Sequence, residues 1–468
     1  MSGGAAQTVQ SGQSRKVLDL PVPKVWAFAV GQFGWALLSG IISNWLVYFY
    51  QPDNETIAQG QTVFVPQGLA VLGVVTVVGG ITAFARFFDA FVDPAVASLS
   101  DRCQSAAGRR MPFLKCAALP LALVTVLVFW SPITGTSWVN GVFLFVAVIG
   151  YYIALTFYCT PYNALIAELG HDSKQQLTIS TAISFTWVAG TAIAYVAPVV
   201  WAGFVPGLGR VNAIRLTFSI MAAIALACML VPPLAIKERD YVNSQPTSES
   251  TVESLKQTFG DGEFRKFVCS DVVYWVAITT FQTGLPFFVT SLLKLPETTT
   301  TIYFVLMTAV SVLFYLPVNL MANHVGKKRI LLVAFAIFTC AFAFAGALGS
   351  GLLGAIPPMA QGLILSIVGA IPMAAFGILP QAIVANIADA SSKTTGQDRQ
   401  GMFYAARTFA MKMGQSVAML LFTGVSTIGM ASGTGYRIAA ICAAVLCGMG
   451  GLVFAFYNER KVLSVLES

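Results

Sequence analysis

Long apolar runs, joined by short polar connections, follow one another along almost the whole chain. A helix that crosses a bilayer needs about 20 mostly apolar residues, and a scan on that basis predicts twelve of them. They cover residues 25–50, 67–99, 112–131, 138–168, 177–203, 213–235, 266–292, 299–322, 330–349, 355–388, 401–428 and 434–457. The first 24 residues are instead polar and rich in Gly, Ser and Gln. The pattern predicts an all-α membrane protein behind a disordered cytoplasmic tail.

Composition supports this prediction and excludes other classes. Of the 468 residues 56% are hydrophobic and 10% are charged, against about 25% charged in a typical soluble protein. The net charge of +7 lies mostly in the short connections, which suits membrane orientation rather than nucleic-acid binding. Both histidines fall in predicted loops, and no nucleophile motif or metal-ligand spacing is present. We therefore expect neither an enzyme nor a cofactor.

The Lys and Arg residues predict the orientation. Twenty lie on the side of the N-terminus and four on the other side, so the positive-inside rule predicts that both termini are cytoplasmic. We expect a multi-pass protein of the plasma membrane that works as a monomer. The three remaining basic residues, Arg86, Arg407 and Lys412, fall within predicted spans.

The longest polar connection, residues 236–265, divides the chain into two six-helix lobes, 25–235 and 266–457, with tails at 1–24 and 458–468. The loops after the second helix of each lobe are alike. "SDRCQSAAGRRMP" (100–112) and "NHVGKKR" (323–329) both combine a glycine with a basic cluster. Twelve helices in two such halves are typical of a transporter whose substrate site lies between the halves near the membrane midplane.

One predicted helix carries three charges, Arg86, Asp89 and Asp93. A charge at the centre of a spanning helix costs about 2.5–3.5 kcal/mol on insertion scales, so these charges indicate a function. Asp89 and Asp93 are four residues apart and share one face of a helix. Together they could hold Na⁺ or a proton. The alternative is a stabilising cluster in which Arg86 and Lys412 neutralise the aspartates and no ion binds.

Three stretches carry a resemblance to a known family: "ARFFDAFVDPAVASLSDRCQSAAGRRMPFL" (85–114), "FYCTPYNALIAELG" (157–170) and "ARTFAMKMGQS" (406–416). They resemble helix 2 with its loop, helix 4 and helix 11 of the glycoside–pentoside–hexuronide:cation symporters. This is the melibiose permease group of the major facilitator superfamily. Vertebrate lysophospholipid symporters share these elements. The resemblance implies the two-lobed major facilitator fold and cation-coupled transport.

In that group the matching aspartates bind the coupling cation, a helix 4 threonine contributes, and a helix 11 lysine lies nearby. The resemblance therefore implies a Na⁺ or H⁺ site at Asp89, Asp93 and Thr156, with Arg86 and Lys412 as counter-charges. The helix 2 asparagine of some relatives is Val92 here. Arg407 lies five residues before Lys412, and we interpret it either as part of this charge system or as a helix-end residue.

The loop signature comprises Asp101, Arg102, Gly108, Arg109 and Arg110. We expect these residues to act as a gate, in which loop cations hold the cytoplasmic ends of the two lobes together through carboxylates such as Glu168 or Asp389. The alternative is that these basic residues only set the orientation of the protein in the membrane.

The substrate site departs from the sugar-binding relatives, which use acidic residues on helices 1 and 4. The matching helix 4 position is Cys159, and helix 1 has no acid near Trp35 and Ala36. Aromatic and amide side chains remain as candidates, with Tyr162 and Asn163 favoured and lipid-belt or packing roles as the alternative. The candidates are Trp35, Cys159, Tyr162, Asn163, Trp187, Trp275, Gln282 and Gln381. We expect symport of a sugar or glycoside by alternating access; a lysophospholipid or another amphiphile is the alternative substrate.

Overall fold

The computed structural model describes residues 18–71, 73, 75–103, 105, 107–170, 173–242, 258–395 and 400–467. The helices of the first half are α1 (Val22–Tyr50), α2 (Asn54–Ala58), α3 (Val77–Asp101), α4 (Met111–Leu127), α5 (Trp138–Leu169), α6 (Ser173–Leu208), α7 (Arg210–Ala235) and α8 (Glu238–Tyr241). The predicted N-terminal tail lies outside the described residues, except for its last seven.

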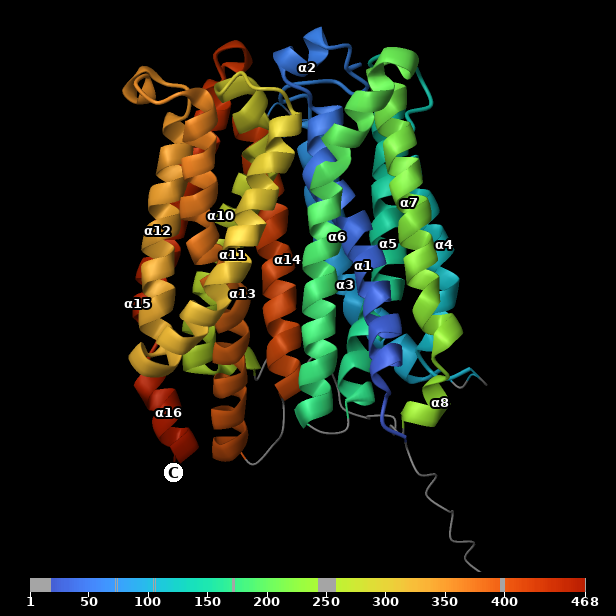
Figure 1. Cartoon of the computed structure of the whole chain (residues 1–468), viewed down its shortest axis with the longest axis vertical. Coiled ribbons are helices and arrows are strands. Elements are labelled where there is room, and N and C mark those ends of the chain that lie inside the picture. The colour runs from blue at the N-terminus through green and yellow to red at the C-terminus, as the bar shows by residue number, and fades with distance from the viewer. Residues whose placement is uncertain are drawn as a thin grey trace, which may run out of the picture.

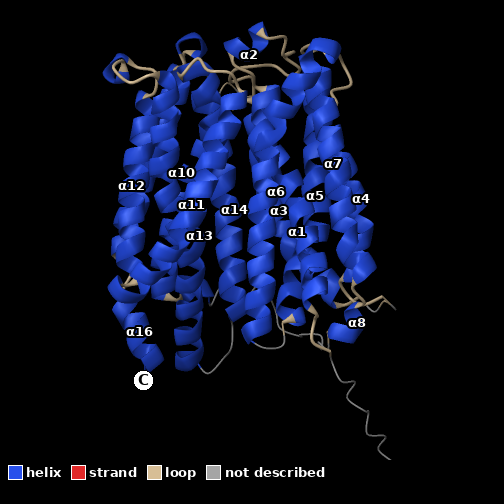
Figure 2. Cartoon of the chain, in the orientation of Figure 1, coloured by secondary structure: helices blue, strands red, loops and turns tan. Residues whose placement is uncertain are grey.

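The second half contains α10 (Gly262–Phe287), which continues as a π-helical turn over Phe288–Leu292, then α11 (Thr298–Val325), α12 (Lys327–Ala347), α13 (Pro358–Thr395), α14 (Gln400–Val425), α15 (Thr434–Ala455) and α16 (Glu459–Glu467). Three-residue 3₁₀ turns lie at Gly351–Leu353 and Met430–Ser432. Figure 2 shows that the described residues form helices joined by loops, without strands. Twelve of these helices have 17 residues or more and match the twelve predicted spans.

Most predicted helix ends differ from the structure by a few residues, and two of the differences have a clear local cause. The span predicted from residue 67 begins at Val77, because Gly68 and Gly73 adopt positive φ angles and the segment before α3 turns back on itself. The middle connection predicted to extend to residue 265 already contains the start of α10. Asp261 caps that helix by accepting hydrogen bonds from the backbone N–H groups of Glu263 (2.9 Å) and Phe264 (2.8 Å).

The two halves repeat the same helix packing. In the first half α1 packs on α6 and α7, α3 on α5, and α4 on α5 and α7. The second half repeats these pairs as α10 on α14 and α15, α11 on α13, and α12 on α13 and α15. Figure 1 shows the two groups standing side by side. The halves meet where α3 packs on α14 and α6 on α11, with a smaller contact between α1 and α10.

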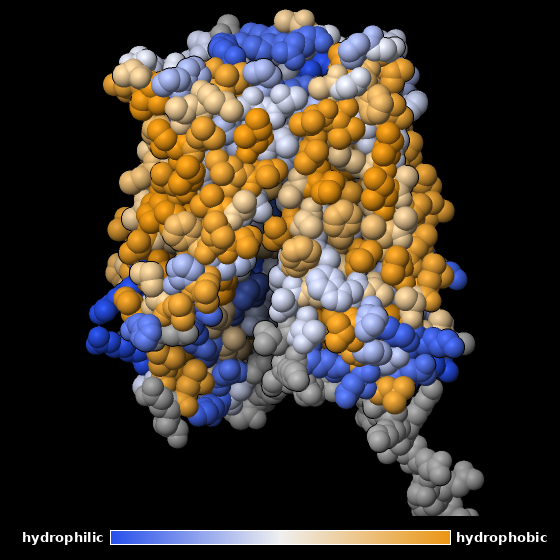
Figure 3. All heavy atoms as spheres, viewed as in Figure 1, coloured by the Kyte–Doolittle hydropathy of each residue, from blue (hydrophilic) through white to orange (hydrophobic). Residues whose placement is uncertain are grey.

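On the face shown in Figure 3, mostly apolar side chains cover the middle of both halves, as a lipid environment requires. Nine of the described helices are long and apolar enough to cross a membrane, and α4 is apolar but shorter. Of the twelve long helices, α3 and α14 fall outside these groups. They carry Arg86, Asp89 and Asp93, and Arg407 and Lys412, respectively. Two helices that carry charged residues within their spans therefore form the largest contact between the halves.

The molecule has two unlike ends. The described termini, Leu18 and Glu467, lie at one end, which we call the terminal end, and α2 lies at the other, which we call the distal end (Figure 1). Figure 3 shows a cleft between the two halves that opens at the terminal end and has hydrophilic surface inside it. At the distal end the halves are in contact.

Candidate cation and substrate site

An ion triad joins the two halves inside the membrane region. The Nζ of Lys412 on α14 lies 2.7 Å from Asp89 Oδ2 and 2.5 Å from Asp93 Oδ2, both on α3. One turn of helix separates the two aspartates, so both carboxylates reach the same ammonium group. The structure thus brings together Asp89, Asp93 and Lys412, three residues that were predicted to form the site because they are charged and lie within apolar runs.

Two threonines on α5 donate hydrogen bonds to the remaining oxygens of the aspartates. Thr156 donates its hydroxyl to Asp89 Oδ1 at 2.5 Å, and Thr160 donates to Asp93 Oδ1 at 3.2 Å. Thr160 was missed by the sequence reasoning, although its spacing is a usable signal. The threonines are four residues apart, as the aspartates are. On adjacent helices each threonine can therefore face one aspartate.

These oxygens could hold a small cation. Two carboxylates and two hydroxyls offer the oxygen ligands that hard cations prefer, and Lys412 occupies the position between the carboxylates. The side chain of Asp89 is 5% exposed, that of Lys412 16% and that of Asp93 27%. An incoming cation would therefore reach Asp93 first and the buried Asp89 last.

Arg86 does not take the position expected for it. It was predicted to reach Asp89, one turn away on α3. Instead its guanidinium donates to Gln415 Oε1 on α14 (2.6 Å) and to Ser43 Oγ on α1 (3.2 Å), and lies 5.7 Å from the ring centre of Tyr152. The described ion pairs include none between Arg86 and a carboxylate. The long side chain points across the interface between the halves instead of along its own helix.

Arg407 is not a helix-end residue, so that interpretation was wrong. It is 8% exposed and its guanidinium makes a two-pronged contact with Asp271 on α10, with distances of 2.8 and 3.1 Å. Asp271 itself was missed, although an acid within a predicted span is a signal by itself. This pair lies wholly within the second half, so it stabilises α10 against α14 without joining the halves.

The loop residues predicted to form a gate make their contacts within the first half. Arg109 and Arg110 both bind Glu168 (3.0 and 2.6 Å), and Arg110 also binds Asp101 (2.7 Å). Burial alone would lower the pKa of the Arg110 guanidinium, but Glu168 and Asp101 raise that pKa above its ordinary value. Arg102 is exposed. Glu168 was the predicted partner, but it belongs to the same half as the arginines. Closure of the halves by these loops is therefore not seen in this conformation and stays a prediction.

The two similar loops share a structural role. Glu238 accepts hydrogen bonds from the backbone N–H groups of Arg109, Arg110 and Met111 at 2.8–2.9 Å, at the start of α4. Glu459 does the same for Lys327 (2.9 Å) and Lys328 (3.0 Å) at the start of α12. Gly108 and Gly326 precede these sites with φ of +115° and +96°, a conformation that favours glycine. The repeated glycine-and-base pattern thus marks a helix start held by a carboxylate.

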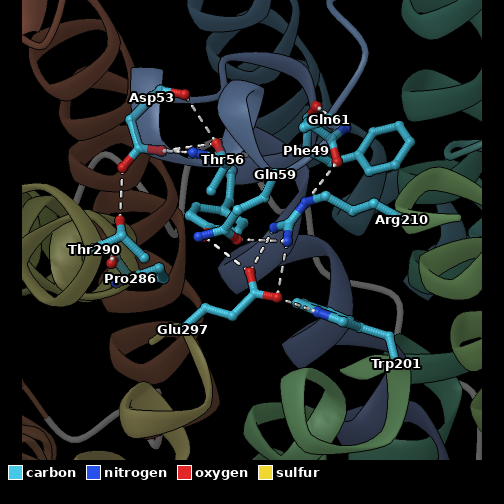
Figure 4. A network of polar contacts seen from close by, with 11 residues as sticks. Phe49, Asp53, Thr56, Gln59, Gln61, Trp201, Arg210, Pro286, Thr290 and Glu297 are labelled. Carbon is cyan, nitrogen blue, oxygen red and sulfur yellow. Dashed lines mark hydrogen bonds and ion pairs between the residues drawn. The ribbon is translucent and has the colours of Figure 1, made fainter. Parts of the chain in front are cut away.

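The halves are tied together at the distal end by a network that the sequence reasoning missed. Arg210, at the start of α7, binds both carboxylate oxygens of Glu297, just before α11, at 2.5 and 3.0 Å (Figure 4). Trp201 Nε1 (2.5 Å) and Tyr48 hydroxyl (3.0 Å) also donate to Glu297. We call Arg210, Glu297, Trp201 and Tyr48 the distal latch. Its carboxylate comes from the second half and its donors come from the first.

A second contact lies beside the latch. Asp53, in the connection after α1, accepts a hydrogen bond from the hydroxyl of Thr290 of the second half (2.6 Å; Figure 4). It accepts another from the hydroxyl of Ser291 of the same half (2.5 Å). Asp53 is fully buried. Gln51 adds a bond to the carbonyl of Thr423 (3.0 Å). The distal end is closed by these contacts, whereas the cleft is open at the terminal end.

Three of the predicted substrate residues are tryptophans that come from both halves. Trp35 on α1 and Trp187 on α6 have ring centres 4.9 Å apart. Trp275 on α10 lies beside Gly414, two residues from Lys412 on α14. The indole N–H groups of Trp35 and Trp275 are buried and have no hydrogen-bond partner among the described residues. Each half therefore supplies one unused indole donor, and Trp275 packs on α14, the helix that carries Lys412.

The other predicted substrate residues are placed differently. Tyr162 is fully buried, stacks on Phe28 with ring centres 4.3 Å apart and donates its hydroxyl to the Phe28 carbonyl (2.7 Å). It therefore packs α5 against α1, and we drop it as a direct substrate contact. Asn163 and Gln381 are exposed, and Cys159 and Gln282 are partly buried. For these four residues substrate contact stays a prediction.

The sequence model of the family described as MFS/sugar transport protein matches residues 27–456. The chain belongs to this family. Its fold is accordingly the major facilitator fold, and the predictions of a transporter and of an entirely helical, two-lobed membrane architecture are confirmed. Membership of a transporter family also confirms the prediction that the chain is not an enzyme.

Two curated relatives are similar over part of their length. The inner membrane symporter YicJ of Escherichia coli (strain K12) is 26% identical over 227 residues, which is 47% of each chain. The isoprimeverose transporter of Lactiplantibacillus pentosus is 23% identical over 266 residues, which is 56% of this chain and 51% of that one. The chain thus matches about half the length of these curated relatives.

Solved structures agree with the fold. A variant of the nucleoside transporter NupG superposes with a TM-score of 0.65 at 12% identity, covering 94% of this chain and all of the other. At that identity the likeness shows the fold and nothing about the substrate.

Proposed function

We propose that the protein is a cation-coupled symporter that carries a sugar or glycoside across the plasma membrane by alternating access. Na⁺ or H⁺ would be the coupling ion, and the terminal end would face the cytoplasm. The sugar class rests on the family and on its curated relatives, one of which is named for isoprimeverose. The positive-inside distribution of Lys and Arg supports the orientation.

The observation that carries the proposal is the ion triad between the halves. Lys412 satisfies two aspartates that belong to the other half. A cation that binds Asp89 and Asp93 must displace the ammonium group, because both occupy the same oxygens. Loss of the Lys412 contacts changes how α14 is held on α3. Ion binding is thereby linked to the relative position of the two halves.

The two ends of the molecule support alternating access. In this structure the distal latch is closed and the cleft opens at the terminal end (Figures 3 and 4). With the terminal end in the cytoplasm, this is an inward-facing state. Uptake requires a second state in which Arg210 and Glu297 separate and the terminal end closes. The region of Arg109 and Arg110 would then lie against the opposite half.

Aromatic side chains support a sugar or glycoside as the substrate. Indole rings pack on the apolar faces of sugar rings, and their N–H groups donate to hydroxyl oxygens. Trp35, Trp187 and Trp275 offer rings from both halves, and two of them have unused N–H donors. A substrate held by both halves would favour their joint movement.

Uptake into proteoliposomes under an imposed Na⁺ or H⁺ gradient tests the proposal. A panel of sugars, glycosides and lysophospholipids would identify the class that accumulates. We expect Asp93→Asn to abolish gradient-driven accumulation while substrate exchange survives in part. Asp19→Asn, the same change at an exposed position, is the matched control and should transport normally. Normal accumulation by Asp93→Asn would make the triad purely structural, and accumulation of lysophospholipids alone would overturn the sugar assignment.

A further inference from the structure

A groove on the outer surface of the first half lies away from the contact between the halves. It has a volume of about 500 Å³, and its ten lining residues all come from α4 and α5. Cys116 and Pro120 line the groove and are exposed, so it opens on the surface that faces the membrane. Figure 1 shows α4 at the edge of the first half, away from the second half. A ligand in this groove would therefore come from the bilayer.

The groove is separate from the cation site, although α5 contributes to both. Gly150, Ala154 and Phe157 line the groove and are spaced four and three residues apart, so they share one face of α5. Thr156 instead points to Asp89 on α3. The cation site thus lies on another face of α5, and the groove requires a different ligand.

The length and lining of the groove suit an acyl chain. Along α4 the lining runs from Pro112 to Val124, a distance of about 18 Å. None of the ten lining residues has a charged, amide or hydroxyl side chain, so the groove offers a sugar almost no hydrogen-bond partner. A void loses the packing contacts of its lining. In a bilayer an acyl chain can fill the groove and restore these contacts.

A lysine lies near the groove at its terminal end. Lys115 is exposed, one turn after the start of α4, and has no hydrogen bond or ion pair among the described residues. Cα–Cβ bonds tilt towards the N-terminus of a helix, so this side chain leans towards the terminal end. A lysine side chain is long enough to keep its ammonium group among the lipid headgroups. An anionic headgroup would supply the missing partner.

The second half has no counterpart of this lysine. Gly108 and Gly326 occupy matching positions before α4 and α12. Lys115 lies seven positions after the first glycine, and Val333 lies seven after the second. Val333 is 57% exposed, so an apolar residue suits this level of the membrane. The lysine on α4 therefore indicates an anionic group beside the groove.

We propose that the groove between α4 and α5 is a binding site for an anionic phospholipid. One acyl chain lies along α4 from Pro112 to Val124, and the phosphate group binds the ammonium group of Lys115. The groove supplies the apolar contacts, and the lysine selects the charge of the headgroup. This site does not depend on which substrate or coupling ion the protein transports.

Photoactivatable lipids in proteoliposomes test the proposal. The probe is phosphatidylglycerol with a diazirine in one acyl chain, and phosphatidylcholine with the same chain is its partner without net charge. Peptide mapping after irradiation locates the label. We expect phosphatidylglycerol to label residues 112–124 and 150–157 about fivefold more than phosphatidylcholine does, the ratio that one basic side chain near the membrane surface predicts. The segment of α12 around Val333 should show no such preference.

A pair of variants tests the headgroup contact. Lys115→Ala should lower the ratio of phosphatidylglycerol to phosphatidylcholine labelling in the groove about fivefold, to nearly equal labelling. Arg329→Ala is the matched control, because Arg329 is an exposed basic residue in the first turn of α12. It should leave the labelling ratio unchanged.

A second pair tests the acyl-chain contact. Gly150→Leu should fill the groove and remove the label, because a Cβ atom at Gly150 would meet only Val124, at the ordinary distance of 3.6 Å. Gly448→Leu is the control, since a Cβ atom there would meet only Thr339, at 3.7 Å. It should leave the label in place. An unchanged thermal unfolding temperature of Gly150→Leu shows that the loss of label does not reflect unfolding. The ratio in Lys115→Ala decides the question if Gly150→Leu unfolds.

Three results would overturn the proposal. Equal labelling of α4 and α5 by the two lipids, or a ratio that Lys115→Ala leaves unchanged, would mean that no anionic headgroup is selected. Label spread evenly over α4, α5, α12 and α13 would mean that the groove holds only the lipid that surrounds any membrane protein. Label retained in a folded Gly150→Leu variant would mean that the acyl chain lies outside the groove.

Discussion

The ion triad and the distal latch both join the two halves, but they are built for different events. Lys412 bonds one oxygen of each of two carboxylates, threonine hydroxyls bond the other two oxygens, and the side chain of Asp93 is 27% exposed. In the distal latch Glu297 is 7% exposed and both of its oxygens are occupied by Arg210, Trp201 and Tyr48. In the triad, a competing cation can replace Lys412 on one carboxylate at a time. In the latch, the three donors share the single carboxylate of Glu297, so their contacts across the halves are lost together.

This difference assigns the two contacts to different parts of the transport cycle. Lys412 can exchange its place with an ion at little net cost, because one cation replaces another on the same carboxylates. Separation of Arg210 from Glu297 leaves two desolvated charges without partners unless water enters as the halves part. Loss of one partner from a buried ion pair costs about 3–5 kcal/mol. The triad is therefore suited to ion sensing, and the latch to holding one end state.

The largest effect is expected at the latch. Glu297→Gln removes the charge that binds Arg210 and should shift the protein away from the state with a closed distal end. Gln51 is buried at that end, so a cysteine introduced there reports the change. In a background without native cysteines, an impermeant thiol reagent added outside should label Gln51→Cys at least about tenfold faster once Glu297 is replaced, given the cost of an unpaired buried charge.

Glu55→Gln is the control for the latch, because Glu55 pairs with Lys294 at an exposed position of the same end. It should leave the labelling rate almost unchanged. Equal rates in Glu297→Gln and the parent would mean that the latch does not hold the distal end closed.

A smaller effect should separate the two threonines of the triad. Thr156 makes a short bond to the buried Asp89, whereas Thr160 makes a longer one to the partly exposed Asp93. Removal of a hydrogen bond to a charged group costs about 1.5–3 kcal/mol when it is buried and less when it is exposed. Thr156→Val should raise the cation concentration for half-maximal transport about tenfold or more. Thr160→Val should raise it by about two- to threefold. The reverse order would mean that Asp93, and not Asp89, dominates cation binding.

The sequence predicted the helices well because the physical requirement is simple. Each spanning segment needs about 20 apolar residues, and twelve runs met it. The boundary at residue 67 failed because the segment before Val77 is apolar in composition but contains glycines with positive φ. Hydropathy cannot distinguish an apolar loop packed on the helix ends from a helix.

The triad could be predicted in part, and the latch could not. Asp89, Asp93 and Lys412 stand out because charges within apolar runs are rare, and the family resemblance supplied their pairing. Glu297 and Arg210 lie at helix starts, where charged residues are common and carry no signal. Their pairing spans 87 positions and two halves. It depends on which end of the molecule is closed, a property of the conformation that no local pattern contains.

Arg86 shows a further limit of spacing arguments. It lies three positions before Asp89, a spacing that favours an ion pair on an isolated helix. In the structure Gln415 from the opposite half and Ser43 from α1 are better placed for its guanidinium. Tertiary contacts therefore decided the partner of this side chain.

The central claim is that Lys412 competes with the coupling cation for Asp89 and Asp93. A double-mutant cycle of Lys412→Ala and Asp93→Asn, read out as apparent cation affinity in transport assays, tests this claim most directly. Lys412→Ala should raise the apparent affinity and slow turnover, because the carboxylates lose their resident cation and the bound ion is no longer expelled by it. The combined change should be less than additive, as expected for groups in contact. Additive effects on cation affinity, or an unchanged affinity in Lys412→Ala, would contradict the competition between Lys412 and the coupling ion.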